Sequence, residues 1–345
     1  MSVRAAIQKV VDGGTLTREE AAAAMDAIMT GEASGAQIGA LVTALRMRGE
    51  TEEEIAGFAE SMRRHALPVP RATSDALVDT CGTGGDGAHT FNISTAAAFV
   101  VAGAGVRVAK HGNRAMTSRC GSADVLEGLG VRVDLTPEAV ARCIDEVGIG
   151  FMYAPVFHPA MRHAGPARKE IGIRTVFNLL GPLTNPAAAQ HQIVGVADAA
   201  VADKLARVLG LLGTRHALVV HSRDGLDELS ISAPTQVSEV RVNGGVEVRR
   251  YELVPEEVGL PTAPLSAVRG GDVEDNVAII RHVLGGGNGA ARAITLLNAA
   301  AALYAADAVG SIAEGVQAAA ESIDSGAAAA KLTELAALSH RLAEG

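Results

Sequence analysis

Hydrophobic residues recur at helical spacing through the first part of the chain, up to about residue 67. Ile38, Leu41, Val42 and Leu45 make one apolar stripe at intervals of three and four residues. Three hydroxyl residues are each followed three positions later by Glu or Gln, the pattern of a capping box that opens a helix. These pairs are Thr17 with Glu20, Ser34 with Gln37 and Thr51 with Glu54. The segment is therefore predicted to be entirely helical, and its stripe suits either core packing or dimerisation.

The pattern changes after Pro68 and Pro70, and we place a boundary at about residue 70. Short apolar runs typical of strands then alternate with helical segments, which predicts βαβ units and a mostly parallel sheet. Helices are expected over about 93–103 and 123–129, and again after Thr136-Pro137-Glu138. The predicted strands cover residues 76–81, 106–110, 131–134, 150–154 and 217–221.

Three further patterns complete the predicted fold. Residues 237–242 and 246–253, joined by Asn243-Gly244-Gly245, predict a hairpin. The Ala-rich last 70 residues predict helices, and residues 158–192 predict helices and tight turns that pack back on the N-terminal helices. The fold class is therefore α/β. We expect a small helical domain over residues 1–70, joined by helices from about 163–192, and a large α/β catalytic domain over 71–345.

Composition narrows the classes of function. A formal net charge of −9 disfavours nucleic acid or an anionic membrane as the main partner, and 3% aromatic residues leave few side chains for base stacking. Three cysteines without a C-x-x-C pair make a disulfide framework or a zinc ribbon unexpected. The first residues lack the apolar region of a signal peptide, and no apolar run is long enough to span a bilayer. These features predict a cytoplasmic location.

The densest chemical pattern is the run from Cys81 to Thr95, which lies between a predicted strand and a predicted helix. Its glycines, Gly82, Gly84 and Gly85, allow the backbone to approach a ligand closely, and successive N–H groups in such a turn bind anions. The helix start that follows, Asn92-Ile-Ser-Thr95, favours phosphate through its free N–H groups and its dipole. The run therefore predicts a phosphate or diphosphate site rather than a plain tight turn, although its spacing matches neither the Walker A nor the Rossmann pattern.

A second polar run, from Lys110 to Asp124, follows the next predicted strand and should lie at the same edge of the sheet. Lys110, Arg114 and Arg119 can bind further phosphate oxygens, together with the hydroxyls of Thr117, Ser118 and Ser122. The alternative is a solvated basic loop. His111 is read as a contact or packing residue before a proton carrier, because catalytic geometry must come before pKa.

Two more clusters complete the candidate chemistry. Asp227 and Glu228 follow the predicted strand at 217–221, and such a pair beside phosphate-binding loops suits Mg²⁺ better than a solvated surface. Arg162, Arg168 and Lys169 suit either a clamp for a second anion or an ordinary charged helix surface, and the spacing alone favours the surface.

Together these residues resemble the anthranilate phosphoribosyltransferase family of tryptophan biosynthesis. The resemblance runs from about residue 5 to residue 340, and Met116, Thr117 and Cys120 are its mild departures. The matching runs are Gly49-Glu-Thr51, Gly82-Thr-Gly-Gly-Asp86, Asn92-Ile-Ser-Thr95, Lys110-His-Gly-Asn-Arg114, Gly121-Ser-Ala-Asp124, residues 174–186 and Asp227-Glu228.

The resemblance implies transfer of 5-phosphoribosyl from 5-phospho-α-D-ribose 1-diphosphate to the amine of anthranilate, with release of diphosphate. It also implies a cleft between the two domains as the active site, Mg²⁺ as cofactor with two ions per site, and a homodimer formed through the helical domains. Ser94, Asp227 and Glu228 resemble the metal ligands, and Asn113 and Arg168 the anthranilate contacts. The other implied substrate-binding residues are Gly82, Gly85, Asp86, Thr90, Asn92, Ile93, Thr95, Lys110, His111, Gly112, Arg114, Ala115, Met116, Thr117, Ser118 and Ser122.

Two other readings stay open. A pyrimidine nucleoside phosphorylase shares the implied architecture, but it would not need the metal pair Asp227-Glu228. A non-catalytic paralogue that binds nucleic acid is disfavoured by the net charge of −9 and the scarcity of aromatic residues. No residue is assigned as a catalytic acid, base or nucleophile.

Overall fold

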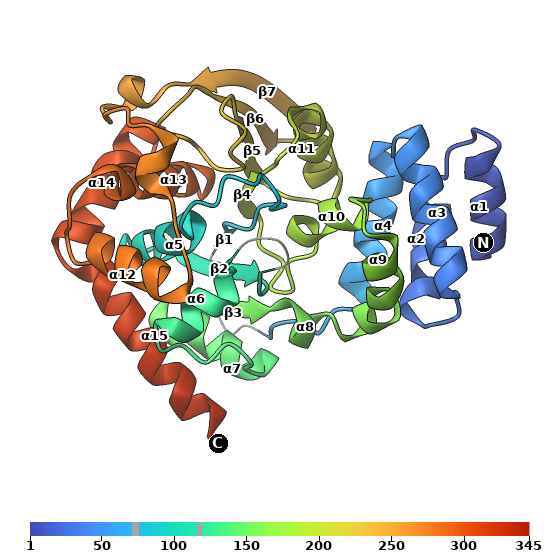
Figure 1. The fold of residues 1–345 in the computed structure, drawn as a ribbon, viewed down its shortest axis with the longest axis horizontal. Helices are drawn as coiled ribbons and strands as arrows, with labels where there is room; N and C mark the ends of the chain where they lie inside the picture. Colours follow the sequence, from blue (N-terminus) through green and yellow to red (C-terminus); the bar gives the residue numbers. More distant parts are fainter. Residues whose placement is uncertain (71–75, 116–118, 345) are drawn as a thin grey trace.

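The computed structural model describes residues 1–70, 76–115 and 119–344 of the chain. Its first part is helical, as predicted, and forms the small lobe at the right of Figure 1. All three predicted capping boxes are present and open the second, third and fourth helices. The four helices are α1 (Val3–Val11), α2 (Arg18–Met29), α3 (Gly35–Arg48) and α4 (Glu52–Arg64).

The apolar stripe of α3 is part of the core of this lobe. Ile38, Leu41, Val42 and Leu45 are all buried within the single chain and pack in one cluster with residues of α1, α2 and α4. Of the two uses that the sequence allowed for this stripe, core packing is therefore the one that the fold adopts.

The large lobe is built on a seven-stranded sheet in the order β3-β2-β1-β4-β5-β6-β7. The first five strands are parallel and the last two antiparallel, which confirms the mostly parallel sheet and the hairpin. The strands are β1 (Leu77–Asp79), β2 (Arg107–Gly112), β3 (Ile149–Tyr153), β4 (His191–Gly195), β5 (His216–Ser222), β6 (Thr235–Val242) and β7 (Val246–Leu253).

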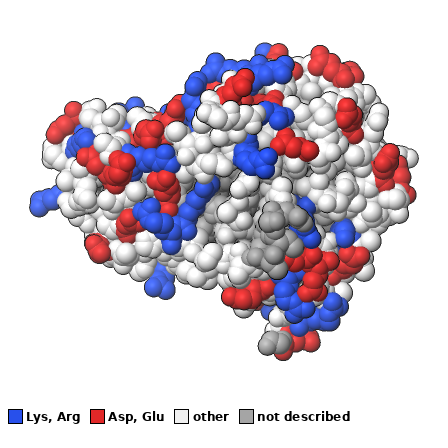
Figure 2. Space-filling model, turned by 180° about the vertical axis from the view of Figure 1, so that it is seen from behind, with Lys and Arg blue, Asp and Glu red and all other residues white. Residues whose placement is uncertain are grey.

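Charged side chains of both signs are interspersed over the face shown in Figure 2, on the small lobe and the large one. Among the described residues, no helix combines the length and the apolar character needed to cross a bilayer.

Helices from three separate stretches of the chain cover the sheet, as predicted for the Ala-rich C-terminal residues (Figure 1). The α-helices of the large lobe are α5 (Ile93–Gly103), α6 (Ser122–Gly128), α7 (Pro137–Arg142), α8 (Ala154–Phe157), α11 (Ala202–Leu211), α12 (Val273–Leu284), α13 (Ala290–Ala305), α14 (Ile312–Asp324) and α15 (Ala327–Ala343). The short helices α9 (Gly165–Ile171) and α10 (Phe177–Leu180) lie against α3 and α4, so this part of the chain does pack back on the N-terminal helices.

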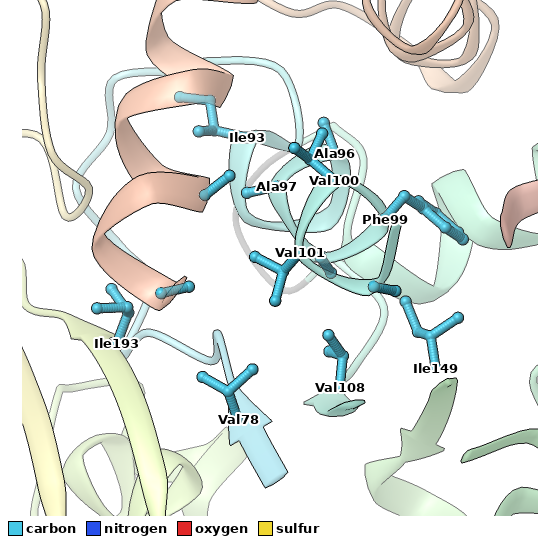
Figure 3. Close-up of a cluster of buried hydrophobic side chains, with 14 of the residues drawn as sticks. Val78, Ile93, Ala96, Ala97, Phe99, Val100, Val101, Val108, Ile149 and Ile193 are labelled. Carbon is cyan, nitrogen blue, oxygen red and sulfur yellow. The ribbon is translucent and has the colours of Figure 1, made fainter. Parts of the chain in front are cut away.

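The helix α5 packs its apolar side across four strands (Figure 3). Val78 of β1, Val108 of β2, Ile149 of β3 and Ile193 of β4 lie in one buried cluster with the α5 side chains. Successive residues of β4 point to opposite faces of the sheet, because side chains alternate along a strand. Val194 accordingly belongs to the cluster on the other face, which α11 and the helical lobe complete.

Polar contacts join the two lobes beside this shared cluster. Arg63 of α4 donates to the main-chain carbonyls of Leu183 and Leu212, and Lys204 of α11 donates to that of Glu50. These contacts hold the segment before β4 and the end of α11 against the helical lobe.

Two elements differ from the predictions. Residues 131–134 do not form a strand: Val131 and Val133 are buried, but the backbone N–H of Arg132 bonds Ser339 of α15 rather than a neighbouring strand. Alternating burial had the period of a strand although a helix covers the segment. The strand β4 was not predicted, because His191 and Gln192 interrupt an apolar run that is only Ile193-Val194-Gly195-Val196.

Candidate active site

The residues singled out by the sequence converge at the carboxyl ends of the parallel strands, the edge where open α/β sheets bind ligands. The glycine-rich loop follows β1, Lys110 to Gly112 end β2, and Asp227-Glu228 lie in the loop after β5. The start of α5, with Ile93 and Ser94, follows the glycine-rich loop. The sheet thus brings together three of the four clusters.

The glycine-rich loop is shaped by close approaches that only glycine permits. Gly84 and Gly85 have φ values of +66° and +84°, which L side chains rarely adopt. A Cβ on Gly85 would lie 1.8 Å from Nη1 of Arg174, which donates a 3.0 Å hydrogen bond to the Gly84 carbonyl. A Cβ on Gly82 would lie 3.0 Å from the carbonyl oxygen of Gly195, at the end of β4. The loop is therefore packed between the end of β4 and the guanidinium of Arg174.

The N-terminus of α5 has no side-chain cap. Asn92 occupies the cap position, but its amide donates to the carbonyl of Cys120 instead of accepting from the helix. Oδ1 of Asn92 and Oγ1 of Thr95 are buried without a hydrogen-bond partner in the described parts of the chain. Uncapped N–H groups with unpaired polar atoms beside them form an environment suited to an anion.

Lys110 joins β2 to this helix start. Its buried Nζ lies 3.0 Å from Oγ1 of Thr80 and 3.2 Å from Oγ of Ser94. Burial lowers the pKa of Lys110, and the nearby carboxylates of Asp79 and Glu228 oppose that effect. The ammonium group therefore lies in the interior, between the phosphate-binding loop and the carboxylates.

A buried carboxylate fixes the end of β2. Asp79 accepts from the backbone N–H of His111 at 3.2 Å and from the side-chain amide of Asn185 at 2.7 Å. Burial raises the pKa of Asp79 to about 6. Asn185 also donates to the carbonyl of Ala109 at 2.9 Å, so β1, β2 and the segment before β4 meet at one side chain.

His111 faces a second imidazole. Its ring lies 5.0 Å from that of His158, and its Nδ1 lies 3.2 Å from the carbonyl oxygen of Gly181. Because a carbonyl only accepts, the proton of neutral His111 belongs on Nδ1. Burial lowers the pKa of His111 to about 3 and of His158 to about 4, so both are neutral at neutral pH. The Nε2 atoms of both rings are buried and lack a hydrogen-bond partner among the described residues.

Three carboxylates meet below the glycine-rich loop. The backbone N–H of Asp227 lies 3.5 Å from Oδ2 of Asp86. Burial raises the pKa of Asp227 well above its usual value, with the charge of Asp86 as the next cause. Burial also raises the pKa of Glu228, which the neighbouring Asp227 raises further and Lys110 lowers. This group of partly buried oxygen donors suits a hard divalent cation such as Mg²⁺.

Two clasps hold the loop that carries Asp227 and Glu228. Asn298 of α13 accepts from the backbone N–H of Leu229 at 3.0 Å and donates to its carbonyl at 2.9 Å. Asp224 accepts from the hydroxyls of Ser230 and Ser232. A Cβ on Gly195 would lie 1.5 Å from the carbonyl oxygen of Asp227. Only glycine therefore fits at this position of β4, where the loop crosses the strand.

The loop after β2 folds over its own end. The hydroxyl of Ser122 donates to the carbonyl of Asn113. A Cβ on Gly112 would lie 2.2 Å from the Oγ of Ser122. Arg114, predicted to bind phosphate, pairs with Asp124 at 3.0 Å and with Glu127 at 2.6 Å. The N–H of Ala115 donates to Asp124. The predicted contacts Met116, Thr117 and Ser118 lie outside the described residues.

The fourth cluster contributes one distinctive cation. Arg168 is partly buried, with its guanidinium carbon 5.0 Å from the centroid of the Phe177 ring. Burial lowers the pKa of Arg168, and the described residues offer it no ion pair or hydrogen bond. Lys169 is exposed, as expected of a helix surface. The remaining predicted contact, Thr90, pairs with Arg269 through an isolated β-bridge at the end of the glycine-rich loop.

Sequence reasoning missed several residues of this region. Asp79, Asn185 and Asn298 act through contacts between residues 32 to 106 positions apart, which periodicity cannot detect. Arg174 and Asn185 both lie in the run 174–186 that carried part of the resemblance. That run was therefore the available signal, although it did not indicate which side chains reach the site.

Comparison with known proteins agrees with this arrangement. Residues 74–329 match the model of the glycosyl transferase family, a/b domain, and residues 4–66 that of the glycosyl transferase family, helical bundle domain. The chain is 62% identical to an anthranilate phosphoribosyltransferase of Thermomicrobium roseum, over 98% of this chain and 97% of that protein.

Solved structures give the same result. The anthranilate phosphoribosyltransferase from Thermus thermophilus superposes with a TM-score of 0.91 at 46% identity, covering 97% of this chain and 99% of that one. The Saccharomyces cerevisiae enzyme, solved in complex with PRPP and Mg, superposes with a TM-score of 0.89 at 28% identity, covering 98% of each chain.

The Asn298 clasp predicts a specific effect on metal binding. Replacing Asn298 by Ala frees the loop after Glu228, so Mg²⁺ affinity should fall by about 10- to 100-fold, as for other residues that orient ligands. Isothermal titration calorimetry with Mg²⁺ measures the change. Thr295→Val is the matched control, since this buried hydroxyl of the same helix bonds, among the described residues, only the carbonyl of Ala291. Equal Mg²⁺ affinity in the two variants would contradict the clasp.

The raised pKa values of Asp227 and Glu228 predict that Mg²⁺ binding depends on pH. In the metal-free protein both carboxyls keep their protons to a higher pH than usual, and Mg²⁺ must displace those protons. Affinity should therefore rise as the pH is raised through the neutral range, where unperturbed carboxyls would already be fully ionised. Titrations near pH 6 and near pH 8 test this, and a flat profile would show that the two groups ionise at ordinary acidic pH.

Proposed function

This chain belongs to the anthranilate phosphoribosyltransferase family, and we propose that its site transfers 5-phosphoribosyl from 5-phospho-α-D-ribose 1-diphosphate to the amine of anthranilate. The products are N-(5-phosphoribosyl)anthranilate and diphosphate, in the tryptophan biosynthetic route. The observation that carries the proposal is the convergence, at one sheet edge, of an uncapped helix N-terminus, a buried lysine and three partly buried carboxylates.

The phosphate groups of the donor would lie along the glycine-rich loop and the start of α5. Gly82, Gly85, Asp86 and Thr90 belong to the loop, and the run from Asn92 to Thr95 opens the helix. Lys110 and Arg174 supply positive charge from two sides, and neither forms an ion pair with a carboxylate in the described parts of the chain. Residues 111–118 and Ser122 would complete the donor site, with His111, Gly112 and Ala115 among them.

The carboxylates of Asp227 and Glu228, with the hydroxyl of Ser94, would hold Mg²⁺, and we propose two ions per site. These residues fit Mg²⁺ because all of their donor atoms are oxygens, which Mg²⁺ prefers. The raised pKa values of Asp227 and Glu228 also show that the protein itself supplies too little positive charge to keep both carboxyls ionised. Bound Mg²⁺ would neutralise the diphosphate and stabilise the negative charge that develops on it.

Anthranilate would bind on the side of the helical lobe. Arg168, whose positive charge the described residues leave without a partner, is suited to its carboxylate, and Phe177 beneath it offers an apolar surface. Asn113 is exposed at the end of β2 and would contact the same substrate. The unprotonated Nε2 atom of His111 can accept a hydrogen bond without adding positive charge.

In the reaction, the bond from C1 of the ribose to the diphosphate oxygen breaks, a bond from C1 to the anthranilate nitrogen forms, and that nitrogen releases one proton to the departing diphosphate or to water. Negative charge then grows on the diphosphate, where Lys110 and the backbone N–H groups of α5 are already oriented, so little reorganisation is needed. The amine is a neutral nucleophile at neutral pH, so positioning by Arg168 and Asn113 contributes more than a strong base. The neutral His111 avoids repelling the positive charge that develops at C1.

Further proposals concern the whole chain. We assign residues 1–70, with helices from about 163–192, to a helical domain and residues 71–345 to the catalytic domain.

A homodimer through the helical lobe would cover Val11 of α1 and Met47 of α3, which are 64% and 84% exposed. Sedimentation velocity would detect this dimer. A cytoplasmic location follows from the proposed substrates and is testable by cell fractionation. Interspersed charges on the face in Figure 2 support small molecules rather than nucleic acid as partners.

Loss of anthranilate fluorescence tests the reaction directly. Purified protein with the phosphoribosyl donor and Mg²⁺ should consume anthranilate and release diphosphate in equal amounts, and omission of Mg²⁺ should stop both. Absence of consumption across a range of Mg²⁺ concentrations would refute the proposal, and thymidine with phosphate would then test the phosphorylase reading.

Arg168 should act on one substrate only. Because its guanidinium is proposed to meet the anthranilate carboxylate, Arg168→Ala should raise the KM for anthranilate by at least about tenfold, corresponding to roughly 1.5–3 kcal/mol for a charged hydrogen bond. The KM for the phosphoribosyl donor should change little. Lys169→Ala, on the exposed side of the same helix, is the control. Equal increases in both KM values would rule out this role.

A further inference from the structure

A second cluster of polar residues lies at the opposite edge of the same sheet. His191 and His216 are the first residues of β4 and β5 and are direct partners across the two strands. Asp307 follows the C-terminal end of α13 with a φ of +55°. The proposed active site uses the carboxyl ends of these strands, so this cluster is separate from it by the length of β4.

The three side chains face one another. Nδ1 of His216 lies 2.9 Å from Oδ1 of Asp307, and Nδ1 of His191 lies 4.0 Å from Oδ2 of the same carboxylate. One ligand atom from each residue can be chosen so that all lie within 4.8 Å of one another. Both imidazoles are almost completely buried, while the carboxylate of Asp307 is 41% exposed. An ion from solvent could therefore reach the cluster past Asp307.

The buried ring of His216 lies between two carboxylates. Its Nδ1 lies 2.9 Å from Oδ1 of Asp307 and its Nε2 lies 3.2 Å from Oε1 of Glu239, and ionised carboxylates only accept hydrogen bonds. A metal ion in place of the Nδ1 proton would satisfy Asp307 and leave His216 as a neutral ligand.

Glu239 has the arrangement of a carboxylate that orients a metal-bound histidine. It accepts from Nε2 of His216, from Nε of Arg241 at 2.8 Å and from the hydroxyl of Tyr304 at 3.1 Å. A metal-binding histidine usually donates its other N–H to such an acceptor, which fixes the ring and raises its basicity. Glu239 is thus held in place by three donors, behind the nitrogen that would face the metal.

The surrounding groups favour a cation on one side and oppose it on the other. The C-terminal end of α13 directs carbonyls at the cluster, which favours a cation. The carbonyl of Ala305 accepts from Nδ1 of His191 at 2.7 Å, so a metal at that nitrogen must displace its proton. Arg241 also donates to Oδ1 of Asp307 at 3.1 Å, and the charge of Arg215 acts on His191. A bound ion must therefore be one that imidazole holds strongly.

We propose that His191, His216 and Asp307 form a binding site for a divalent transition metal, with Zn²⁺ as the best match. Two imidazole nitrogens and one carboxylate are a common zinc ligand set, whereas Mg²⁺ prefers oxygen donors alone. The ion would tie the amino ends of β4 and β5 to the end of α13. It plays no part in the transfer reaction.

Zinc titration of the chelator-treated protein tests the site, with excess Mg²⁺ present to occupy the carboxylates of the proposed active site. Calorimetry should show one saturable Zn²⁺ site, and scanning fluorimetry should show a rise in Tm that Mg²⁺ alone does not give. Asp307→Asn keeps the shape and suits the positive φ, and His191→Gln removes a second ligand. Each should weaken Zn²⁺ by more than the roughly 10- to 100-fold expected for Glu239→Gln.

The control variant is His282→Asn, an exposed imidazole of α12 outside the cluster, and it should bind Zn²⁺ like the unaltered protein. Zinc affinity that is unchanged in Asp307→Asn and His191→Gln would overturn the proposal. So would the absence of any saturable site under these conditions, which would make the cluster a hydrogen-bonded network without a metal.

Discussion

The proposed active site depends on an excess of buried negative charge at one edge of the sheet. Asp86, Asp227 and Glu228 lie together, burial opposes the ionisation of Asp227 and Glu228, and the charge of Lys110 favours that of Glu228. Burying unpaired charge costs free energy that the rest of the fold must supply. Binding of Mg²⁺ would offset this cost, because the cation supplies the missing positive charge. The geometry of the surrounding loops serves to keep these groups in place until then.

Three strands share the task of holding that arrangement. β1 carries the glycine-rich loop and Asp79, β2 carries Lys110 and His111, and β4 ends in the glycine that lets the Asp227 loop cross it. Asp79 and Asn185 are both buried, and their hydrogen bonds connect β1 to β2. On the far side, Asn298 fixes the carboxylate loop from α13. The catalytic edge is therefore preorganised by residues that never need to touch a substrate.

Much of this could be predicted from sequence, because its signals are local. Capping boxes, the Gly82–Asp86 run and the helix start at Asn92-Ile-Ser-Thr95 each involve neighbouring residues, and all gave the correct elements. β4 was missed because only three or four apolar residues mark it, although it pairs with both β1 and β5. The strand predicted at 131–134 was wrong, because alternate residues are buried in the same way whether the segment packs in a sheet or against a helix such as α15. The roles of Asp79, Asn185 and Arg174 need long-range contacts that no local pattern contains.

The two ends of the sheet differ in how they treat charge. At the amino end, Glu239 and Asp307 are each met by His216 and Arg241. Burial alone would raise the pKa of Glu239, but the hydrogen bonds from those two side chains lower it to about 2. At the carboxyl end, the pKa values of Asp227 and Glu228 are raised by burial, and too few cations face them to oppose it. A carboxylate with a lowered pKa stabilises the fold above acidic pH, whereas one with a raised pKa destabilises it once ionised. The paired network can thus strengthen the same β4, β5 and α13 whose other ends support the unpaired cluster. A sheet that is fastened at one edge can tolerate unfavourable electrostatics at the other.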